Sequence, residues 1–240
     1  MLKQNNYFDN LYELLQRDFS QLDEAFIDLK NNQIGDEGIA NSVSYQDHFQ
    51  SIKSLILQIQ NCKIGFQGVS NLGNSLVKII RLKDLTINIS YNNIQIEGLK
   101  NGCCPFFNNQ EFLIKMDLEA RFIDMFENNE INFQNIFSLN SCLKTLSIDL
   151  NFLNCLNIQN FGEGLANCID LSALSLEIYK NTCDQLTGID LYLAISQCKN
   201  LNSLFISLES RDGENELTQN LRQSCLKLKR LVTFVYYLFE

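Results

Sequence analysis

The chain has 240 residues, 45% of them hydrophobic, and a formal net charge of −9. This length and apolar content are enough for a continuous buried core. The negative balance argues against nucleic acid as a partner, because such binding neutralises phosphates with Lys and Arg. The longest apolar stretches are strand-sized, which excludes a membrane-spanning helix, and we expect no membrane partner.

The first element expected along the chain is an N-terminal cap over residues 1–21. Apolar residues recur at helical spacing within 6–18, at Tyr7, Leu11, Leu14 and Leu15. The spacing predicts an amphipathic helix that covers the end of the structure that follows it. A partner-binding helix is the alternative interpretation of this segment.

Residues 22–240 repeat one phrase eight times. Each copy has an apolar residue, two variable residues, and then three further apolar residues separated by single variable ones. The copies begin at Leu22, Ile52, Leu82, Leu113, Leu143, Leu171, Leu201 and Leu228. A period near 30 residues is typical of a solenoid, in which each unit buries its apolar face against its neighbours.

The third copy shows the phrase in full, with Leu85, Ile87 and Ile89 followed by Asn92 and Gly98. Apolar residues spaced by two place one face of a short strand inward. A buried Asn amide after the strand can bond backbone groups of adjacent turns, and a Cys can replace it in part. Among the inward strand positions of all eight copies, only Thr233 is polar.

This phrase resembles the leucine-rich repeat family, and its long ribonuclease-inhibitor-like subtype in particular. The strand part of the match covers all eight copies, and the turn part is clear in three, at Asn32, Cys62 and Asn92. The resemblance implies an α/β solenoid (horseshoe) of about eight repeats, with parallel strands on the concave side and helices on the convex side. We expect strands centred near residues 27, 57, 87, 118, 148, 176, 206 and 233. Convex segments are expected around 36–49, 66–80, 161–168, 186–198 and 214–226, and 100–111 should be the least regular.

The nine cysteines include no C-x-x-C pair. Cys168, Cys198 and Cys225 each lie three residues before the first leucine of a copy, in a column otherwise held by Phe19, Phe49 and Ile79. We therefore expect reduced, buried thiols and no metal site. Together with the absence of a signal-peptide run in residues 1–9, this predicts a cytoplasmic location.

Catalysis finds little support in the sequence. The chain has a single histidine, His48, and no phosphate-binding glycine loop or kinase motif. A lone histidine near the end of an expected helix is more often incidental than a general base. We expect neither enzymatic activity nor a cofactor.

The expected function is a non-enzymatic protein–protein interaction module or scaffold subunit. The alternative is a regulator of an enzyme, such as a small GTPase activator or inhibitor, or the repeat region of a larger signalling protein. The wording of Asn32 to Gly38 resembles both ribonuclease inhibitors and leucine-rich-repeat activators of small GTPases. An activator would need an exposed Arg or amide near phosphate; the arginines considered are Arg17, Arg81, Arg121, Arg211, Arg222 and Arg230.

The residues between the inward strand positions should point to the concave face. The candidate binding residues there are Asp28, Gln58, Asn88, Asp117, Glu119, Asp149, Glu177, Tyr179, Phe205, Phe234 and Tyr236. Acidic residues dominate the middle copies and apolar ones the ends. The pattern predicts a protein partner with a basic segment flanked by apolar anchors, or only a solvated sheet face. The aromatic run over 231–240 either folds over the last copy or meets another protein.

Overall fold

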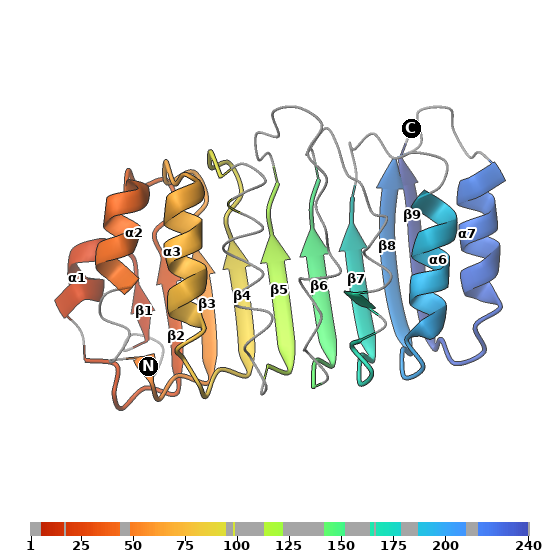
Figure 1. Ribbon diagram of the computed structural model, residues 1–240, viewed down its shortest axis with the longest axis horizontal. Coiled ribbons are helices and arrows are strands. Elements are labelled where there is room, and N and C mark those ends of the chain that lie inside the picture. Colours follow the sequence, from red (N-terminus) through yellow and green to blue (C-terminus); the bar gives the residue numbers. More distant parts are fainter. Residues whose placement is uncertain are drawn as a thin grey trace.

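A single open sheet of parallel strands forms the molecule, with helices packed on one face (Figure 1). The computed structural model describes residues 6–16, 18–43, 49–94, 98, 113–121, 142–151, 164–165, 167–178, 187–209 and 216–239. The strands follow chain order from β1 to β9, every neighbouring pair is parallel, and the sheet does not close into a barrel.

The strands of the sheet are short. They are β1 (Tyr7–Phe8), β2 (Glu24–Asp28), β3 (Ser54–Gln58), β4 (Asp84–Asn88), β5 (Lys115–Glu119), β6 (Thr145–Asp149), β7 (Ala173–Glu177), β8 (Ser203–Glu209) and β9 (Thr233–Phe239). The helices are α1 (Leu11–Gln16), α2 (Gly35–Val43), α3 (Phe66–Leu76), α6 (Thr187–Gln197) and α7 (Glu216–Leu226). None of these helices is long and apolar enough to cross a membrane.

Alternation along each strand separates the core from the other face of the sheet. In β3, Leu55 and Leu57 are buried while Ser54 and Gln58 are only partly covered. Neighbouring strands pair without stagger, so that Leu57 lies beside Ile87 and Ile87 beside Leu118. The prediction that alternate residues of β2 to β8 are buried is confirmed. The expected segment 100–111 and half of 161–168 lie outside the described residues.

The N-terminal segment differs from the expected helix over 6–18. Tyr7 and Phe8 form β1, which pairs with β2, and only Leu11–Gln16 is helical. Phe8 and Leu14 are buried, whereas Tyr7 is exposed on the face opposite the helices. Tyr7 and Phe8 form hydrogen bonds with the free edge of β2 and so add a ninth strand to the sheet. A segment of two residues is too short to show the alternation of apolar and polar residues that predicts a strand.

The expected register of the last copy is wrong by three residues. Ile206 pairs with Tyr236 and Ser207 with Tyr237, so Leu231 stands where Leu201 does and the interval is again 30. Thr233 is exposed at the start of β9, and Phe234 and Tyr236 pack against the core. Phe234 and Tyr236 are therefore on the helix side of the sheet and not on the binding face. Tyr237 takes the place expected for Phe234.

The turns after β2 to β4 hold the expected amide column. Asn92 is buried and its Nδ2 donates to the carbonyl oxygens of Ile59 (2.8 Å) and Ile89 (2.9 Å). Cys62 stands one turn earlier, where its Sγ donates to the carbonyl oxygen of Leu29. Asn32 repeats the Asn92 bond to its own strand, at Leu29, in a more exposed setting.

Close packing requires a glycine at position 68, in the first turn of α3. A Cβ on Gly68 would lie 2.5 Å from the Asp36 carboxylate and 2.7 Å from Cγ2 of Ile64. The same Asp36 carboxylate accepts the backbone N–H of Gly65 at 2.6 Å. The Ile-x-x-x-Gly motif formed by Ile64 and Gly68 thus lets α3 approach α2 closely.

The cysteines behave as buried residues. Cys168 and Cys198 lie in the column of Phe19, Phe49 and Ile79, as predicted, and all five are buried. Cys225 is buried too, but with the corrected register it belongs one helical turn earlier, beside the position of Ile195. Burial raises the pKa of Cys168 to about 12, of Cys198 to about 11 and of Cys225 to about 12.

Candidate functional site

The face of the sheet opposite the described helices, here the open face, carries one polar column along the carboxyl ends of the strands. The pairing aligns Asp28, Gln58, Asn88, Glu119, Asp149, Glu177, Ser207 and Tyr237. Parallel sheets are usually covered on both faces. A nine-stranded parallel sheet with polar residues on one face therefore makes that face the candidate interaction surface.

The middle of the open face holds an ionic cluster made of Asp117, Glu119, Arg121, Asp149 and Glu177. The Arg121 guanidinium donates through Nε and Nη2 to the Asp149 carboxylate, which is 4% exposed. Nη2 also lies 3.9 Å from Oε2 of Glu177. Arg121 thus contacts two of the four carboxylates, Asp149 and Glu177, and the cluster keeps a negative balance.

Neighbouring amides extend this cluster along the sheet. Asn88 Nδ2 donates to Oε2 of Glu119 at 2.7 Å, and Asn151 Nδ2 approaches Oε2 of Glu177 at 3.5 Å. Within its own strand end, Asp149 Oδ1 accepts the backbone N–H of Asn151 at 3.1 Å. The side chains are held in a continuous row over β4 to β7.

Burial acts on the two glutamates of the cluster. Desolvation raises the pKa of Glu119 above its ordinary value, and Arg121 opposes this shift while the other carboxylates reinforce it. Desolvation also raises the pKa of Glu177, reinforced by Asp149 and opposed by Arg121. Both carboxyls lose hydration that the single guanidinium does not replace, so a cation from a partner would stabilise their charged forms.

The N-terminal end of the open face carries an aromatic patch formed by Tyr7 and Phe26. Their rings meet edge to face with centroids 5.1 Å apart. The Tyr7 hydroxyl donates to Oδ2 of Asp28 at 3.3 Å, and the same oxygen lies 3.0 Å from Nζ of Lys30. Both rings remain exposed.

The C-terminal end carries a second aromatic patch, formed by Phe205 and Tyr237. Their ring centroids are 5.6 Å apart and the rings are tilted by 56°. Tyr237 is exposed and Phe205 is partly buried. The two patches flank the ionic cluster from opposite ends of the sheet.

The structure places most of the expected binding residues on the open face. These are Asp28, Gln58, Asn88, Asp117, Glu119, Asp149, Glu177 and Phe205. Tyr179 lies outside the described residues. The expectation missed Tyr7 and Tyr237, and it did not name Arg121 as a binding residue. Arg121 follows Glu119 by two residues, so strand alternation already directs it to the same face.

The described residues contain no group of three or more His, Cys, Asp or Glu side chains arranged to hold a metal ion. His48, Arg17 and Arg211 lie outside the described residues. Of the arginines considered for a GTPase activator, Arg121 is held by Asp149, and Arg230 donates to the carbonyl oxygens of Ile195 and Ser196. Arg81 and Arg222 are exposed.

A cavity of about 50 Å³ lies in the core between α2, α3 and strands β2 and β3. Its lining is aliphatic and aromatic apart from Ser75, whose hydroxyl donates to the Asn71 carbonyl oxygen. The cavity has the character of a packing void. It offers no set of polar groups that could orient a substrate.

Comparisons with known proteins give little beyond this description. No family model matches the sequence, and no curated protein matches it. Among solved structures, the chain is similar to leiomodin-1 actin-binding site 2 (ABS2), at 12% identity and a TM-score of 0.36. The match covers 92% of this chain and 86% of that chain. A similarity this distant carries no functional argument.

Proposed function

We propose that the chain is a leucine-rich-repeat solenoid that serves as a non-enzymatic protein-binding module through its open face. The observation that carries the proposal is the polar face of the parallel sheet that none of the described helices covers. Side chains there lie in a register fixed by eight strand pairings. Such a surface is extended and rigid, which suits recognition of a protein segment more than enclosure of a small substrate.

The chemistry of the face indicates the partner. The ionic cluster has a negative balance, and two of its glutamates have raised pKa values because they are partly desolvated. The aromatic patches at Tyr7 and Phe26, and at Phe205 and Tyr237, offer apolar contact on either side. A partner with a basic segment between two apolar anchors complements this surface.

Charge reversal within the cluster tests the proposal. Asp149 is unsuitable for charge reversal because it is buried and paired with Arg121. A lysine there would disrupt the ionic cluster itself. Asp117→Lys with Glu177→Lys alters partly exposed members. Glu13→Lys with Glu37→Lys, on α1 and α2, makes the same change in net charge on the helix side and serves as the matched control.

Affinity purification with the parent and both double variants separates the outcomes. We expect the open-face variant to lose partners that the parent and the helix-side variant both recover. Equal recovery by all three chains, with both variants folded as judged by circular dichroism, overturns the proposal.

A further inference from the structure

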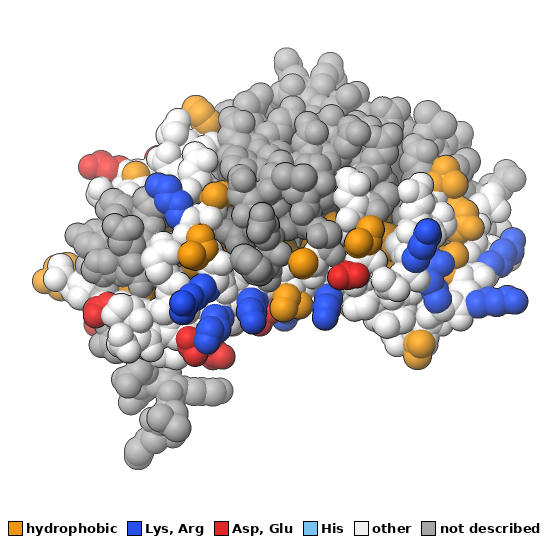
Figure 2. All heavy atoms as spheres, turned by 60° about the horizontal axis from the view of Figure 1, so that its bottom comes forward, with side chains coloured by type: hydrophobic (Ala, Val, Ile, Leu, Met, Phe, Trp, Pro, Cys, Tyr) orange, Lys and Arg blue, Asp and Glu red, His pale blue; other side chains and the backbone are white. Residues whose placement is uncertain are grey.

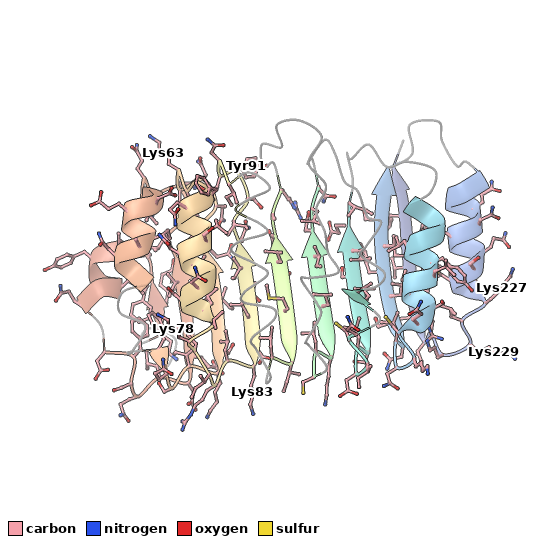
Figure 3. The ribbon with its side chains drawn as sticks, in the orientation of Figure 1. Lys63, Lys78, Lys83, Tyr91, Lys227 and Lys229 are labelled. Atoms are coloured by element: carbon pink, nitrogen blue, oxygen red, sulfur yellow. The ribbon has the colours of Figure 1, made fainter. Side chains whose placement is uncertain are left out.

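The edge of the sheet where β3 to β9 begin carries most of the basic charge of an acidic chain, whereas the start of β2 beside it is acidic, with Asp18, Asp23 and Glu24. This edge, here the basic rim, comprises residues 49–54, 77–84, 113–115, 142–145, 167–173, 198–203 and 226–233, which lead into β3 to β9. Figure 2 shows Lys and Arg side chains along its lower margin. In Figure 3, Lys78, Lys83 and Lys229 lie toward that edge, whereas Lys63 and Tyr91 lie at the opposite one.

The segregation of charge is large. Three basic residues precede β4 and three precede β9: Lys78, Arg81, Lys83, Lys227, Lys229 and Arg230. One each leads into β3, β5, β6 and β8: Lys53, Lys115, Lys144 and Lys199. The rim thus holds ten of the 19 Lys and Arg but two of the 28 Asp and Glu, Asp84 and Asp170. Its formal charge is +8, against −17 for the rest of the chain.

Most of these cations are available to a ligand. Lys53 is paired with Asp23 at 3.1 Å, and Arg230 is bound to backbone carbonyl oxygens. Lys83, Lys115 and Lys144 are exposed and make no ion pair with any residue that the structure describes. They occupy neighbouring strands, which in a parallel sheet lie about 5 Å apart.

Exposed aliphatic side chains stand among the lysines. Val232 is 87% exposed and Ile80 is 64% exposed, and Ile169 and Leu226 are comparable. Figure 2 shows hydrophobic groups between the basic ones along the same margin. The exposed aromatic rings of the described residues lie elsewhere, including Tyr7, Phe26 and Tyr237. The rim therefore lacks the stacking groups that single-stranded nucleic acid uses.

The rim is also level. The first residues of β3 to β9 pair directly with one another, from Ser54 with Asp84 to Ser203 with Thr233. Strand starts without stagger place the basic and aliphatic groups along one edge.

From these observations we infer that the basic rim docks peripherally on an anionic lipid surface, against the expectation from the sequence that the chain has no membrane partner. Lysines would contact headgroup phosphates while the aliphatic groups enter the interface. Glu119 lies four residues beyond Lys115, about 13 Å along the strand, which exceeds the Debye length of about 8 Å at physiological salt, whereas Asp117 lies only about 7 Å beyond Lys115. Asp149 and Glu177 are level with Glu119, so these three carboxylates lie beyond the screening length from the rim and stay free for the proposed protein partner.

Vesicle flotation with the full chain tests this inference. The vesicles are phosphatidylcholine alone or phosphatidylcholine with one third phosphatidylserine. The rim variant is Lys83→Glu, Lys115→Glu and Lys144→Glu. The matched control, with the same change in net charge, is Lys63→Glu and Arg222→Glu with Gln67→Glu and Gln219→Glu, which are exposed and lie off both the rim and the open face.

We expect the parent and the control to float with anionic vesicles only. The rim variant should bind the anionic vesicles more weakly than the parent, by a factor on the order of ten or more. Ile80→Ser with Val232→Ser should weaken binding without changing charge. Failure of the parent to float, or equal loss in the control, overturns the inference. Binding to polyuridylate or polyglutamate in place of vesicles also overturns it, and assigns the rim to another polyanion. A lipid result in either direction leaves the open-face proposal intact, because the two surfaces are altered separately.

Discussion

Oδ1 of Asn92 accepts the backbone N–H of Cys62 at 2.9 Å, across 30 residues of sequence. The same oxygen accepts the N–H of Ile64 at 3.1 Å, while Nδ2 donates to Ile59 and Ile89. One buried amide thus satisfies backbone groups of two successive turns.

Asn92→Ala should therefore destabilise the chain by about 1–3 kcal/mol, because buried donors and acceptors of two turns lose their partner. Asn32→Ala is the matched control, since Asn32 occupies the same column but is exposed and should cost less. Urea denaturation of both variants measures the difference. Equal midpoints for Asn92→Ala and the parent would show that the amide column does not stabilise the fold.

Leu176→Ala should cost about 2–5 kcal/mol, because it opens a cavity in the sheet–helix interface. Leu176 is buried in the middle of β7 and pairs with Ile148 and Ile206. Leu193→Ala on the exposed side of α6 is the control and should change the free energy of unfolding by about 0.5 kcal/mol or less. A comparable loss in the two variants would contradict the assignment of the inner face.

Glu119→Gln with Glu177→Gln should stabilise the chain at pH 7. Both glutamates have folded pKa values above the ordinary one, so their ionisation costs folding free energy at neutral pH. That cost disappears as the pH falls through the raised values toward the ordinary pKa near about 4.3. The melting-temperature gap between variant and parent should shrink on acidification. A gap that widens instead would contradict the raised values.

Peptide-resolved alkylation of the native chain should modify Cys142 long before Cys168, Cys198 and Cys225. Cys142 is exposed, whereas the other three thiols are buried with pKa values of about 12, 11 and 12. In denaturant the four should react alike. Rapid native labelling of Cys168, Cys198 and Cys225 would show that these three positions are not buried.

The same thiols should make the fold sensitive to alkali. Their stabilising effect is fully present below the ordinary pKa of about 8.5 and is lost as the pH rises toward the folded values, because only the unfolded chain ionises in that window. At pH 10 the loss is on the order of 2 kcal/mol per thiol. Denaturation curves between pH 8 and pH 10 measure it, with Cys198→Ala as the variant that should show a smaller slope.

Sequence patterns predicted β2 to β8 because one face of each strand is buried, and a slip of one residue would turn Leu57 or Ile87 to the wrong side. That constraint fails over 233–239, where both faces are apolar or aromatic. The repeat motif could therefore be aligned with its first leucine at Leu228 as well as at Leu231. Two signals of this slip were present in the sequence: the expected register put the polar Thr233 in an inward position, and it made the last interval only 27 residues long.

The candidate site was predictable in its columns but not in its pairings. Strand alternation alone places Glu119, Asp149 and Glu177 on one face. The ion pair between Arg121 and Asp149 depends on the conformation of the Arg121 side chain just beyond the end of β5, which strand alternation does not specify. The basic rim could not be predicted from the net charge of the chain, because that value adds up acidic and basic surfaces that lie apart in the fold.

Hydroxyl-radical footprinting of the complex recovered by affinity purification tests most directly whether the open face binds the protein partner. The open face carries Phe26, Phe205 and Tyr237, and the helix side carries the exposed rings of Tyr12 and Phe66. We predict that Phe26, Phe205 and Tyr237 become protected in the complex while Tyr12 and Phe66 react as in the free chain. Protection of Tyr12 and Phe66 with unchanged oxidation of the open-face rings would contradict the proposed site.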